Sequence, residues 1–368
     1  MPFITASEKQ WSPIVSVSTG RLKEMLRPIQ GNSPDNADSP YICFFFVGNI
    51  YKFSRVNSEK ILKDTWLFDQ IGPKIVKDIS ENRCLLVLDL SNEGAFFDKS
   101  VFDDIFFWIE NYNIDPRNII LVCQNRSIGG ILKEMYPGRK LIETLDFDYF
   151  VKLIANAFSL NEDVFNSKYS FRRQDAISNI KNKKKFHFLC MNSTTRPNRI
   201  SFAAMLKNKG ILCDTLFSWH GNDFSRKTGT RSFDQVEGFL NDVGALDYLK
   251  DDAAYFLNAD PIVIDSVQQG GNDLSQNIVP DLFYSSVASL VTESEFSNGS
   301  MRRVTEKSIK AYCMGHPTII FGNPGSLDVI KSFGFQTFDS IIDERYDRIE
   351  STRDRFSELM KSILSFSS

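Results

Sequence analysis

Short apolar runs alternate with helical stretches along the first half of the chain. The apolar runs are about as long as strands, and polar turn residues follow them; they cover residues 41–47, 84–90 and 118–123, with 140–143 as a weaker fourth. The stretches with helical spacing cover residues 59–79, 99–113, 128–135 and 146–160. Apolar, β-branched runs separated by helices predict a parallel sheet with both faces covered.

The same alternation begins again in the second half. Strands are predicted at residues 186–191, 212–219, 288–292 and 318–321, and helices at 198–210, 304–314, 325–333 and 344–364. The two halves are separated by a polar stretch in which residues 172–185 carry six basic side chains and one acidic side chain. This stretch is interpreted either as a solvated linker or as a basic edge that faces an anionic ligand.

These patterns predict an α/β protein of two domains with a cleft between them. The N-terminal domain would span residues 1–165, a basic linker residues 166–185, and the C-terminal domain residues 186–340. A charged amphipathic helix is expected within the remaining residues, 341–368.

Composition and charge narrow the class of protein. The chain has 368 residues, with 43 Lys and Arg against 46 Asp and Glu, so its net charge is −3. A dedicated nucleic-acid binder usually carries a basic excess. No apolar run approaches the ~20 residues of a membrane span, and no leader pattern begins the chain. The six Cys are dispersed without a CxxC pair, which favours buried thiols and a cytoplasmic location. Three His predict no zinc site.

The first candidate for binding chemistry follows the strand at residues 186–191. Ligands of open α/β sheets bind outside the carboxyl ends of the strands, and here a polar turn leads into a helix. Free N–H groups at a helix start favour an anion, and two arginines add planar donors. The candidate phosphate-binding residues are Asn192, Thr195, Arg196 and Arg199. The alternative is ordinary N-capping by Ser193 or Thr195 with surface arginines.

A second set of candidates follows the strand at residues 288–292. An acidic residue opens the next helix, where it could accept both hydroxyls of a ribose while basic neighbours lie near the phosphates. The alternative is a carboxylate that only suits the helix dipole. The residues of this set are Glu293, Arg302, Arg303, Thr305, Glu306 and Lys307. There is no Walker A or GxGxxG pattern, which removes the best support for an NTPase or a dinucleotide-dependent dehydrogenase.

The run VTESEF…RRVTEKSIKAYCMGHPTIIFGNPGSLDVIKSFGFQTF (residues 291–338) resembles the donor-binding end of GT-B glycosyltransferases, in the style of fucosyltransferases and related bacterial surface-glycan transferases. The resemblance implies two Rossmann-like domains facing a cleft. It also implies that Glu306 binds the nucleotide ribose, with Thr305 and Lys307 beside it, and that the turn at residues 192–199 is the phosphate-side loop. The segment GFQTFDSIIDERYD resembles the closing part of such enzymes, so residues 341–368 are expected to return to the N-terminal domain.

The activity implied by this resemblance is transfer of a sugar from a nucleotide-activated donor to a glycan or lipid-linked acceptor, without a metal or other cofactor. A lipid-linked acceptor is compatible with peripheral membrane contact, and the oligomeric state is left open. An inverting enzyme needs a general base. Glu93, which follows the strand at 84–90, is the first candidate, and His220 and Asp223 are the next. A solvated loop carboxylate and a structural histidine are the corresponding alternatives.

Several readings stay open beside this one. Residues 172–185 are the only hint of a nucleic-acid partner, which would make a modified DNA base the acceptor. The chain could instead bind a nucleotide or a sugar phosphate without turnover, or act as a sugar-nucleotide epimerase or hydrolase. One DxD triplet, Asp146-Phe147-Asp148, could hold a metal-bound diphosphate. It opens a predicted helix in the half without the donor-like motif, so the metal-independent reading is preferred.

Overall fold

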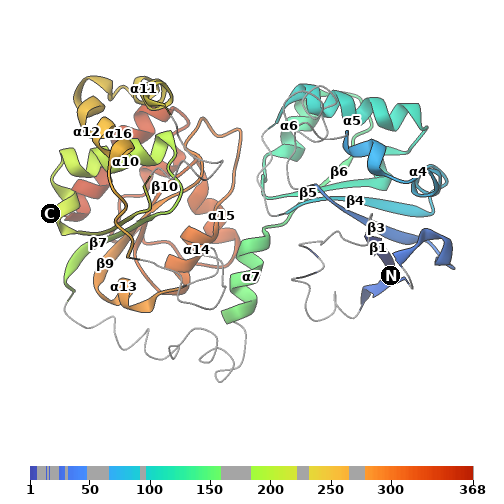
Figure 1. Cartoon of the computed structure of the whole chain (residues 1–368), viewed down its shortest axis with the longest axis horizontal. Coiled ribbons are helices and arrows are strands. Elements are labelled where there is room, and N and C mark those ends of the chain that lie inside the picture. The colour runs from blue at the N-terminus through green and yellow to red at the C-terminus, as the bar shows by residue number, and fades with distance from the viewer. Residues whose placement is uncertain are drawn as a thin grey trace. The chain divides into compact units, whose positions relative to one another are not determined.

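The structure is a computed structural model, and it divides into two compact units (Figure 1). Unit 1 contains Met1–Lys152 and Ser300–Arg303, and unit 2 contains Leu153–Gly299 and Val304–Ser368. The structure describes residues 1–5, 14, 16, 25–29, 32–47, 66–91, 97–158, 184–221, 232–264 and 278–367. Each unit contains a parallel sheet and helices, as the alternating pattern predicts.

Unit 1 is built on a six-stranded parallel sheet with the order β2-β1-β3-β4-β5-β6. Its strands are β1 (Pro2–Thr5), β2 (Arg27–Pro28), β3 (Tyr41–Phe46), β4 (Cys84–Leu90), β5 (Ile119–Cys123) and β6 (Glu143–Asp146). Its helices are α4 (Pro73–Ser80), α5 (Lys99–Asn111) and α6 (Ile128–Met135), and α7 (Tyr149–Phe158) runs on into unit 2. Short 3-10 turns cover Pro34–Asn36, Leu67–Gln70 and Pro116–Asn118.

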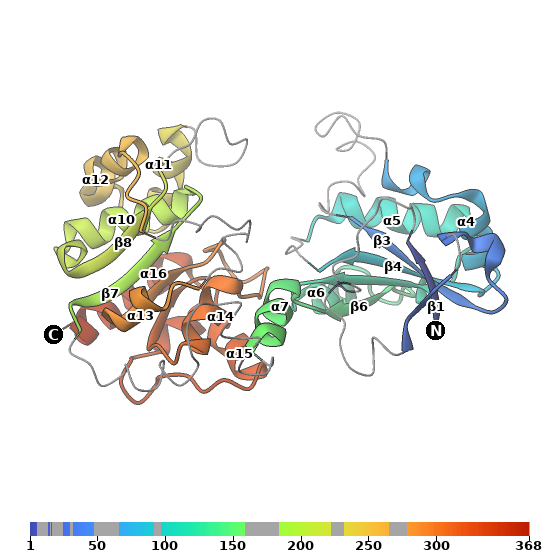
Figure 2. The same cartoon turned by 60° about the horizontal axis from the view of Figure 1, so that its bottom comes forward.

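Helices α4, α5 and α6 pack on one face of the unit 1 sheet. The strands β3 to β6 are added in one direction, and right-handed crossovers then place α4, α5 and α6 on the same side. Figure 2 shows α4 and α5 over this face. Alternate side chains such as Cys43 and Leu88 join the core under these helices, whereas Phe44 and Val87 belong to a smaller cluster on the opposite face.

Unit 2 is built on a four-stranded parallel sheet with the order β10-β9-β7-β8. Its strands are β7 (Phe186–Asn192), β8 (Thr215–Trp219), β9 (Ser286–Thr292) and β10 (Thr318–Phe321). Its helices are α10 (Pro197–Asn208), α11 (Phe233–Asp242), α12 (Leu246–Asn258), α13 (Pro280–Tyr284), α14 (Glu306–Cys313), α15 (Ser326–Ser332) and α16 (Thr352–Ser367), and 3-10 turns cover Ile211–Asp214 and Arg345–Arg348.

The direction of strand addition reverses in unit 2 between β7 and β9. The step from β7 to β8 runs one way across the sheet and the step from β9 to β10 runs the other way. Their connecting helices therefore lie on opposite faces. Phe202 of α10 belongs to the larger core, together with α11, α12 and α16, whereas Met314, directly after α14, belongs to the cluster that also contains Phe283 of α13 (Figure 1).

Several predicted elements differ from the observed ones. The strand predicted at residues 140–143 is observed as β6, which shares only Glu143 with the prediction, because an edge strand with the sequence ETLD carries no apolar run. The helix predicted at 59–79 begins at Pro73 in the described part, because Gly72-Pro73 sets its start. The helix predicted at 146–160 is α7, and β8 begins after a 3-10 turn. The sequence analysis did not predict β1, β2, α11, α12 or α13.

The last helix belongs to unit 2. Phe356, Leu359 and Ile363 of α16 are buried in the larger core of this unit, and the turn at Arg345–Arg348 packs beside them. The sequence analysis instead expected residues 341–368 to return to the N-terminal domain. The apolar face of α16 is thus buried in the unit 2 core, with Phe356 beside Phe321 of β10.

Each edge strand of the unit 2 sheet has backbone groups that other parts of the chain engage. At the β10 edge, the backbone N–H of Ile320 donates to the hydroxyl of the buried Tyr346, at 3.0 Å. At the end of the β8 edge, Trp219 and Ile262 form an antiparallel bridge with N–H···O distances of 2.7 and 2.6 Å. These contacts satisfy edge groups that would otherwise face solvent.

His316 is a structural residue beside the first residues of β9. Its Nδ1 lies 2.7 Å from the hydroxyl of Ser289, and its Nε2 lies 2.9 Å from the carbonyl oxygen of Ser286. Burial lowers the pKa of His316 from 6.5 to about 4, and nearby Lys184 acts in the same direction. The ring is therefore neutral in the folded protein at pH 7 and donates one hydrogen bond and accepts another.

The buried ring should make the folded state less stable in acid. Its pKa is lower in the folded chain than in the unfolded chain, so stability is lost as the pH falls below 6.5 toward 4. The full loss is about 3 kcal/mol. Burial raises the pKa of Asp347 to about 7, so this residue makes the folded state more stable as the pH falls. We therefore expect His316→Gln to be less stable than wild type at about pH 7.5, with the difference in unfolding free energy shrinking at about pH 4.5. A difference that stays constant across this range would contradict the assignment.

Candidate functional site

The strand order reverses between the central strands β7 and β9. The carboxyl ends of these two strands and the starts of α10 and α14 therefore lie on the same side of the unit 2 sheet. In open α/β sheets, ligands bind at such a switch point, outside the carboxyl ends of the strands. The hydroxyl of Thr292, the last residue of β9, donates to Oδ1 of Asn192, the last residue of β7, at 2.5 Å. The two strand ends are thus tied directly together. The polar residues around them, here named the switch-point cluster, are Asn192, Thr195, Arg196, Arg199, Glu293, Glu295, Thr305, Glu306 and Lys307.

Within this cluster, Glu293 anchors the start of α14. Its Oε1 accepts the backbone N–H of Thr305 at 2.9 Å and the hydroxyl of Ser308 at 2.5 Å, and its Oε2 accepts the hydroxyl of Thr305 at 2.6 Å. The Glu293 side chain is buried. Because three protein donors already engage its carboxylate, Glu293 positions α14 instead of presenting an open acceptor to a ligand.

Glu306 and Lys307 form the exposed part of the α14 start. Thr305 is the N-cap, and its hydroxyl accepts from the backbone N–H of Lys307 at 3.5 Å. The Glu306 side chain is 13% exposed, and its Oε1 lies 2.7 Å from Nζ of Lys307. Burial alone would raise the pKa of Glu306, but Lys307 and Lys310 lower it to about 2. Glu306 is therefore ionised at neutral pH, and its two oxygens have capacity for further hydrogen-bond donors.

The start of α10 has no side-chain cap. The N-cap residue is Arg196, with extended backbone and no cap hydrogen bond, and Pro197 follows it. The N-cap position is therefore held by Arg196 and not by Ser193 or Thr195, the residues considered from the sequence. The Arg196 guanidinium is partly exposed; it donates to the carbonyl oxygen of Ser294 at 3.2 Å and lies 3.6 Å from Oε1 of Glu295.

Arg199 is a buried cation without an ion-pair partner among the described residues. Its side chain is 2% exposed, and Nη1 donates to the carbonyl oxygen of Thr194 at 2.9 Å. Its Nε has no hydrogen-bond partner in the described part of the chain. Burial lowers the pKa of Arg199 to about 10, so the group remains charged at neutral pH. The carboxylates of Glu293, Glu306 and Glu295 act on its pKa in the opposite direction, but none of them forms a direct ion pair with it in the described structure. A buried guanidinium whose Nε lacks an acceptor at a switch point favours an anionic ligand.

The remaining predicted residues are not all part of this cluster. His220 is half-buried directly after β8, and its backbone N–H donates to the carbonyl oxygen of Asn192 at 3.1 Å. Arg302 and Arg303 belong to unit 1, where the Arg303 guanidinium donates to Oε1 of Gln124. The proposed bases Glu93 and Asp223 lie outside the described residues.

Some polar residues of the site were missed in the sequence. Asn198 is buried on α10 and donates to the carbonyl oxygen of Glu293 at 3.3 Å. Ser308 and the buried Lys310 lie on α14. The three-residue spacing of Thr305 and Ser308, which puts two hydroxyls on one side of a helix start, was an available signal.

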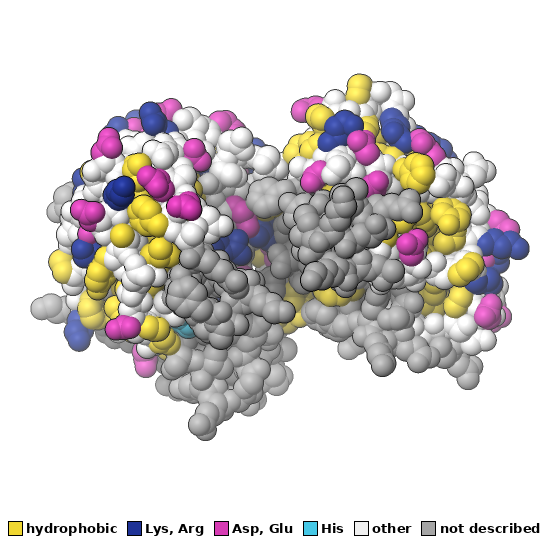
Figure 3. All heavy atoms as spheres, turned by 45° about the horizontal axis from the view of Figure 1, so that its top comes forward, with side chains coloured by type: hydrophobic (Ala, Val, Ile, Leu, Met, Phe, Trp, Pro, Cys, Tyr) yellow, Lys and Arg dark blue, Asp and Glu magenta, His cyan; other side chains and the backbone are white. Residues whose placement is uncertain are grey.

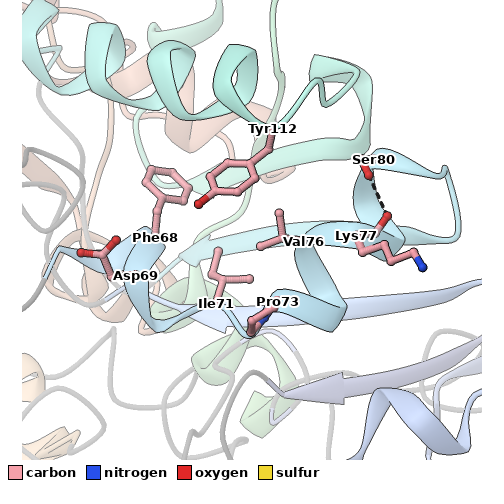
Figure 4. Close-up of a pocket in the computed structure, with 8 residues that line it drawn as sticks. All are labelled: Phe68, Asp69, Ile71, Pro73, Val76, Lys77, Ser80 and Tyr112. Atoms are coloured by element: carbon pink, nitrogen blue, oxygen red, sulfur yellow. Dashed lines mark hydrogen bonds between the residues drawn. The ribbon is translucent and has the colours of Figure 1, made fainter.

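A surface pocket in unit 1 contains none of the switch-point cluster residues. It has a volume of about 430 Å³ and lies beside α4 and the end of α5 in unit 1 (Figure 4). Phe68, Ile71 and Tyr112 line it, and the hydroxyl of Ser80 donates to the carbonyl oxygen of Lys77. It lies on the helix-covered side of the unit 1 sheet, and none of the predicted site residues contributes to it.

The described surface carries charges of both signs. On the face drawn in Figure 3, Lys and Arg side chains are interspersed with Asp and Glu side chains on each unit. Within the described ranges, no group of three or more His, Cys, Asp or Glu side chains could hold a metal ion, and no helix is long and apolar enough to cross a membrane. Comparison with known proteins found no matching family model, curated protein or solved structure.

Proposed function

We propose that unit 2 binds the nucleoside diphosphate part of an activated sugar, and that the protein is a metal-independent glycosyltransferase of GT-B architecture. The acceptor class we favour is a glycan or a lipid-linked sugar. The observation that carries the proposal is the buried guanidinium of Arg199 at the β7–β9 switch point, whose Nε has no hydrogen-bond partner among the described residues. A diphosphate would supply an acceptor for Nε and a directly bonded anion.

The residues of the cluster divide naturally between the parts of such a donor. Arg199 and the uncapped N–H groups at the start of α10 suit the diphosphate. The ionised carboxylate of Glu306 suits the hydroxyls of a ribose, and the partly exposed Lys307 lies beside it. Glu293 would act only by fixing the start of α14.

In the proposed reaction, Arg199 and the N–H groups at the start of α10 would stabilise the departing diphosphate. An acceptor hydroxyl oxygen forms a bond to the anomeric carbon, the bond from this carbon to the diphosphate oxygen breaks, and a general base takes the hydroxyl proton. Negative charge then grows on the diphosphate, where a preorganised cation is worth several kcal/mol. The base remains Glu93 as a proposal from the sequence, with His220 and Asp223 as alternatives.

The experiment that tests the proposal combines binding and product analysis. Thermal shifts are measured with UDP, GDP, CDP and ADP, because a ligand bound only to the folded state raises its stability by ~2.7 kcal/mol at a hundredfold excess over Kd. The nucleotide that binds is then offered as its sugar derivatives, with and without glycan acceptors. If no nucleotide shifts the melting temperature, the proposal fails. Binding without transfer or hydrolysis would instead favour a non-catalytic binder.

The role of Glu306 predicts selectivity for ribose. Wild-type protein should bind the ribonucleoside diphosphate more tightly than its 2′-deoxy analogue, since a charge-assisted hydrogen bond contributes ~1.5–3 kcal/mol. Glu306→Ala should bind both about equally, with the ribonucleotide Kd raised about tenfold or more. Glu110→Ala, an exposed carboxylate of unit 1, is the control and should keep the preference. Unchanged ribose selectivity in Glu306→Ala, measured by calorimetry, would remove Glu306 from the site.

A further inference from the structure

The segment that follows β9 is anchored within unit 2 on both sides of a short loop. Before the loop, the carboxylate of Glu293 is bound to the start of α14. After it, Oδ1 of Asn323 accepts the backbone N–H of Ser297 at 2.7 Å, and the Arg355 guanidinium donates to the carbonyl oxygen of Ser297. We name residues 294–296, which lie between these anchors, the β9 loop.

The β9 loop has a buried side and a half-buried side. Its buried side is Phe296, whose ring stacks on that of Phe321 in β10 with ring centres 4.1 Å apart and planes 7° apart. Its half-buried side consists of Ser294 and Glu295, and both of these residues contact Arg196 at the start of α10. The loop therefore brings a carboxylate to the helix start at which an anion is expected to bind.

The contact between Arg196 and Glu295 is loose. Nη1 of Arg196 donates to the carbonyl oxygen of Ser294 at 3.2 Å, and the same atom lies 3.6 Å from Oε1 of Glu295. The second distance exceeds the ~2.7–2.9 Å of a charge-assisted hydrogen bond. The Arg196 side chain is 44% exposed, so solvent also screens the pair. A phosphate oxygen that bonds directly to this guanidinium can therefore replace the carboxylate.

Glu295 and Arg196 also act on the buried cation of the site. Arg196 is the N-cap of α10, three residues before Arg199, so both guanidinium groups belong to one helix start. Burial is the main cause that lowers the pKa of Arg199; Arg196 lowers it further, whereas Glu295 raises it. The Glu295 carboxylate thus supplies negative charge to the same two cations that a bound phosphate would meet.

We propose that Glu295 is an internal competitor for the anion at the switch point, and that a bound phosphate takes its place beside Arg196. The residue then determines how strongly the site holds an anion, and the β9 loop is the element that presents it. The inference rests on the proposed function in so far as the anion is the diphosphate of a nucleotide.

The competition has a consequence for the release of the product. When the bond from the anomeric carbon to the diphosphate oxygen breaks, this oxygen keeps the electron pair, and the terminal phosphate then has a second ionisation with a pKa of ~6. The free diphosphate therefore carries more negative charge at neutral pH than the sugar-bound donor. Because like charges repel, Glu295 weakens binding of the diphosphate more than binding of the donor, which limits inhibition by the product.

Calorimetry with the nucleoside diphosphate that binds wild type tests this inference. Glu295→Gln should lower its Kd about three- to fivefold, near the upper end of what exposed ion pairs contribute, and should lower the Kd of the matching nucleotide sugar by a smaller factor. The control is Glu358→Gln, which removes the same charge from an ion pair with Lys361 in unit 2 and should change neither Kd. A diphosphate Kd that does not fall in Glu295→Gln, or an equal fall for both ligands, would overturn the inference.

A double-mutant cycle distinguishes competition for Arg196 from a general effect of charge. In an Arg196→Gln background, Glu295→Gln should change the diphosphate Kd by less than about twofold, because the guanidinium for which carboxylate and phosphate compete is gone. A three- to fivefold fall in both backgrounds would mean that Glu295 acts without Arg196, and the competition would be refuted.

Inorganic pyrophosphate separates this inference from the proposed function. It offers the anion without a ribose or a base, and Glu295→Gln should bind it about three- to fivefold more tightly than wild type does. If wild type binds pyrophosphate but no nucleotide, the proposed function fails and the pyrophosphate Kd values decide the competition. If wild type binds neither, both fail. If the nucleotide binds and Glu295→Gln leaves its Kd unchanged, the inference alone fails.

Discussion

Arg199→Met should abolish the thermal shift produced by nucleoside diphosphates without lowering the melting temperature of the free protein. The guanidinium is buried, its Nε is without a partner in the described part of the chain, and its one described hydrogen bond goes to the carbonyl oxygen of Thr194. Met is of similar size and removes the cost of burying a charge whose Nε lacks an acceptor. Losing its bonds to a buried phosphate should cost about 2–4 kcal/mol, or ~30- to 1000-fold in Kd.

The matched control for this variant is a second buried arginine. Arg355 on α16 also has an unpartnered Nε in the described structure and a pKa lowered to about 10 by burial. Its Nη1 donates to the carbonyl oxygens of Ile349 and Glu350, and its guanidinium stacks 4.3 Å from the ring centre of Phe296. Arg355→Met should therefore lower the melting temperature by several degrees. A similar loss of stability in Arg199→Met would mean that Arg199 is structural, and the proposed anion site would fall.

Glu293→Ala should strongly lower the stability of the free protein, whereas Arg199→Met should leave it unchanged. The variant leaves the N–H and hydroxyl of Thr305 and the hydroxyl of Ser308 without their common acceptor. Unsatisfied buried donors cost about 1–3 kcal/mol each before relaxation, so we expect a loss of about 3 kcal/mol in the unfolding free energy, or roughly 10 °C. The start of α14 should loosen, and nucleotide affinity should fall with it.

Chemical denaturation and calorimetry at one temperature measure both effects of this variant. Glu293→Gln is the control, because its remaining carbonyl oxygen can accept from Thr305, and it should lose less stability than Glu293→Ala. If Glu293→Ala unfolds like wild type but loses nucleotide affinity, the carboxylate contacts the ligand and our assignment of a positioning role is wrong.

The sequence predicted the buried strands of both units. It also predicted that candidate binding residues follow the carboxyl ends of two strands in unit 2. Runs such as residues 84–90 are apolar on both faces, so pattern alone locates them. The edge strand β6 is polar, and no pattern marks it. The Thr305–Glu306 helix start was also predicted, because capping is local. The bond from Glu293 to that start joins two residues that lie twelve positions apart in the connection between β9 and α14, and no local pattern predicts it.

The largest difference concerns residues 302 and 303. As basic residues shortly before a predicted donor-binding helix, they were expected to bind the donor, because neighbours in sequence are usually neighbours in space. In the structure they are held by Gln124 and Asn125, nearly two hundred positions earlier in the chain. The polar side chains of Gln124 and Asn125 follow β5 directly, and residues 300–303 of the chain itself occupy their hydrogen-bonding groups.

The hydroxyl of Tyr346 on β10 and the bridge of Ile262 to Trp219 have a consequence for assembly. A peptide or another copy of the chain that joins a protein by extending its sheet must find exposed amide and carbonyl groups along an outer strand. In unit 2 the N–H of Ile320 on β10 and both backbone groups of Trp219 on β8 are already engaged within the chain. A partner strand that extends this sheet would have to displace these contacts at either margin.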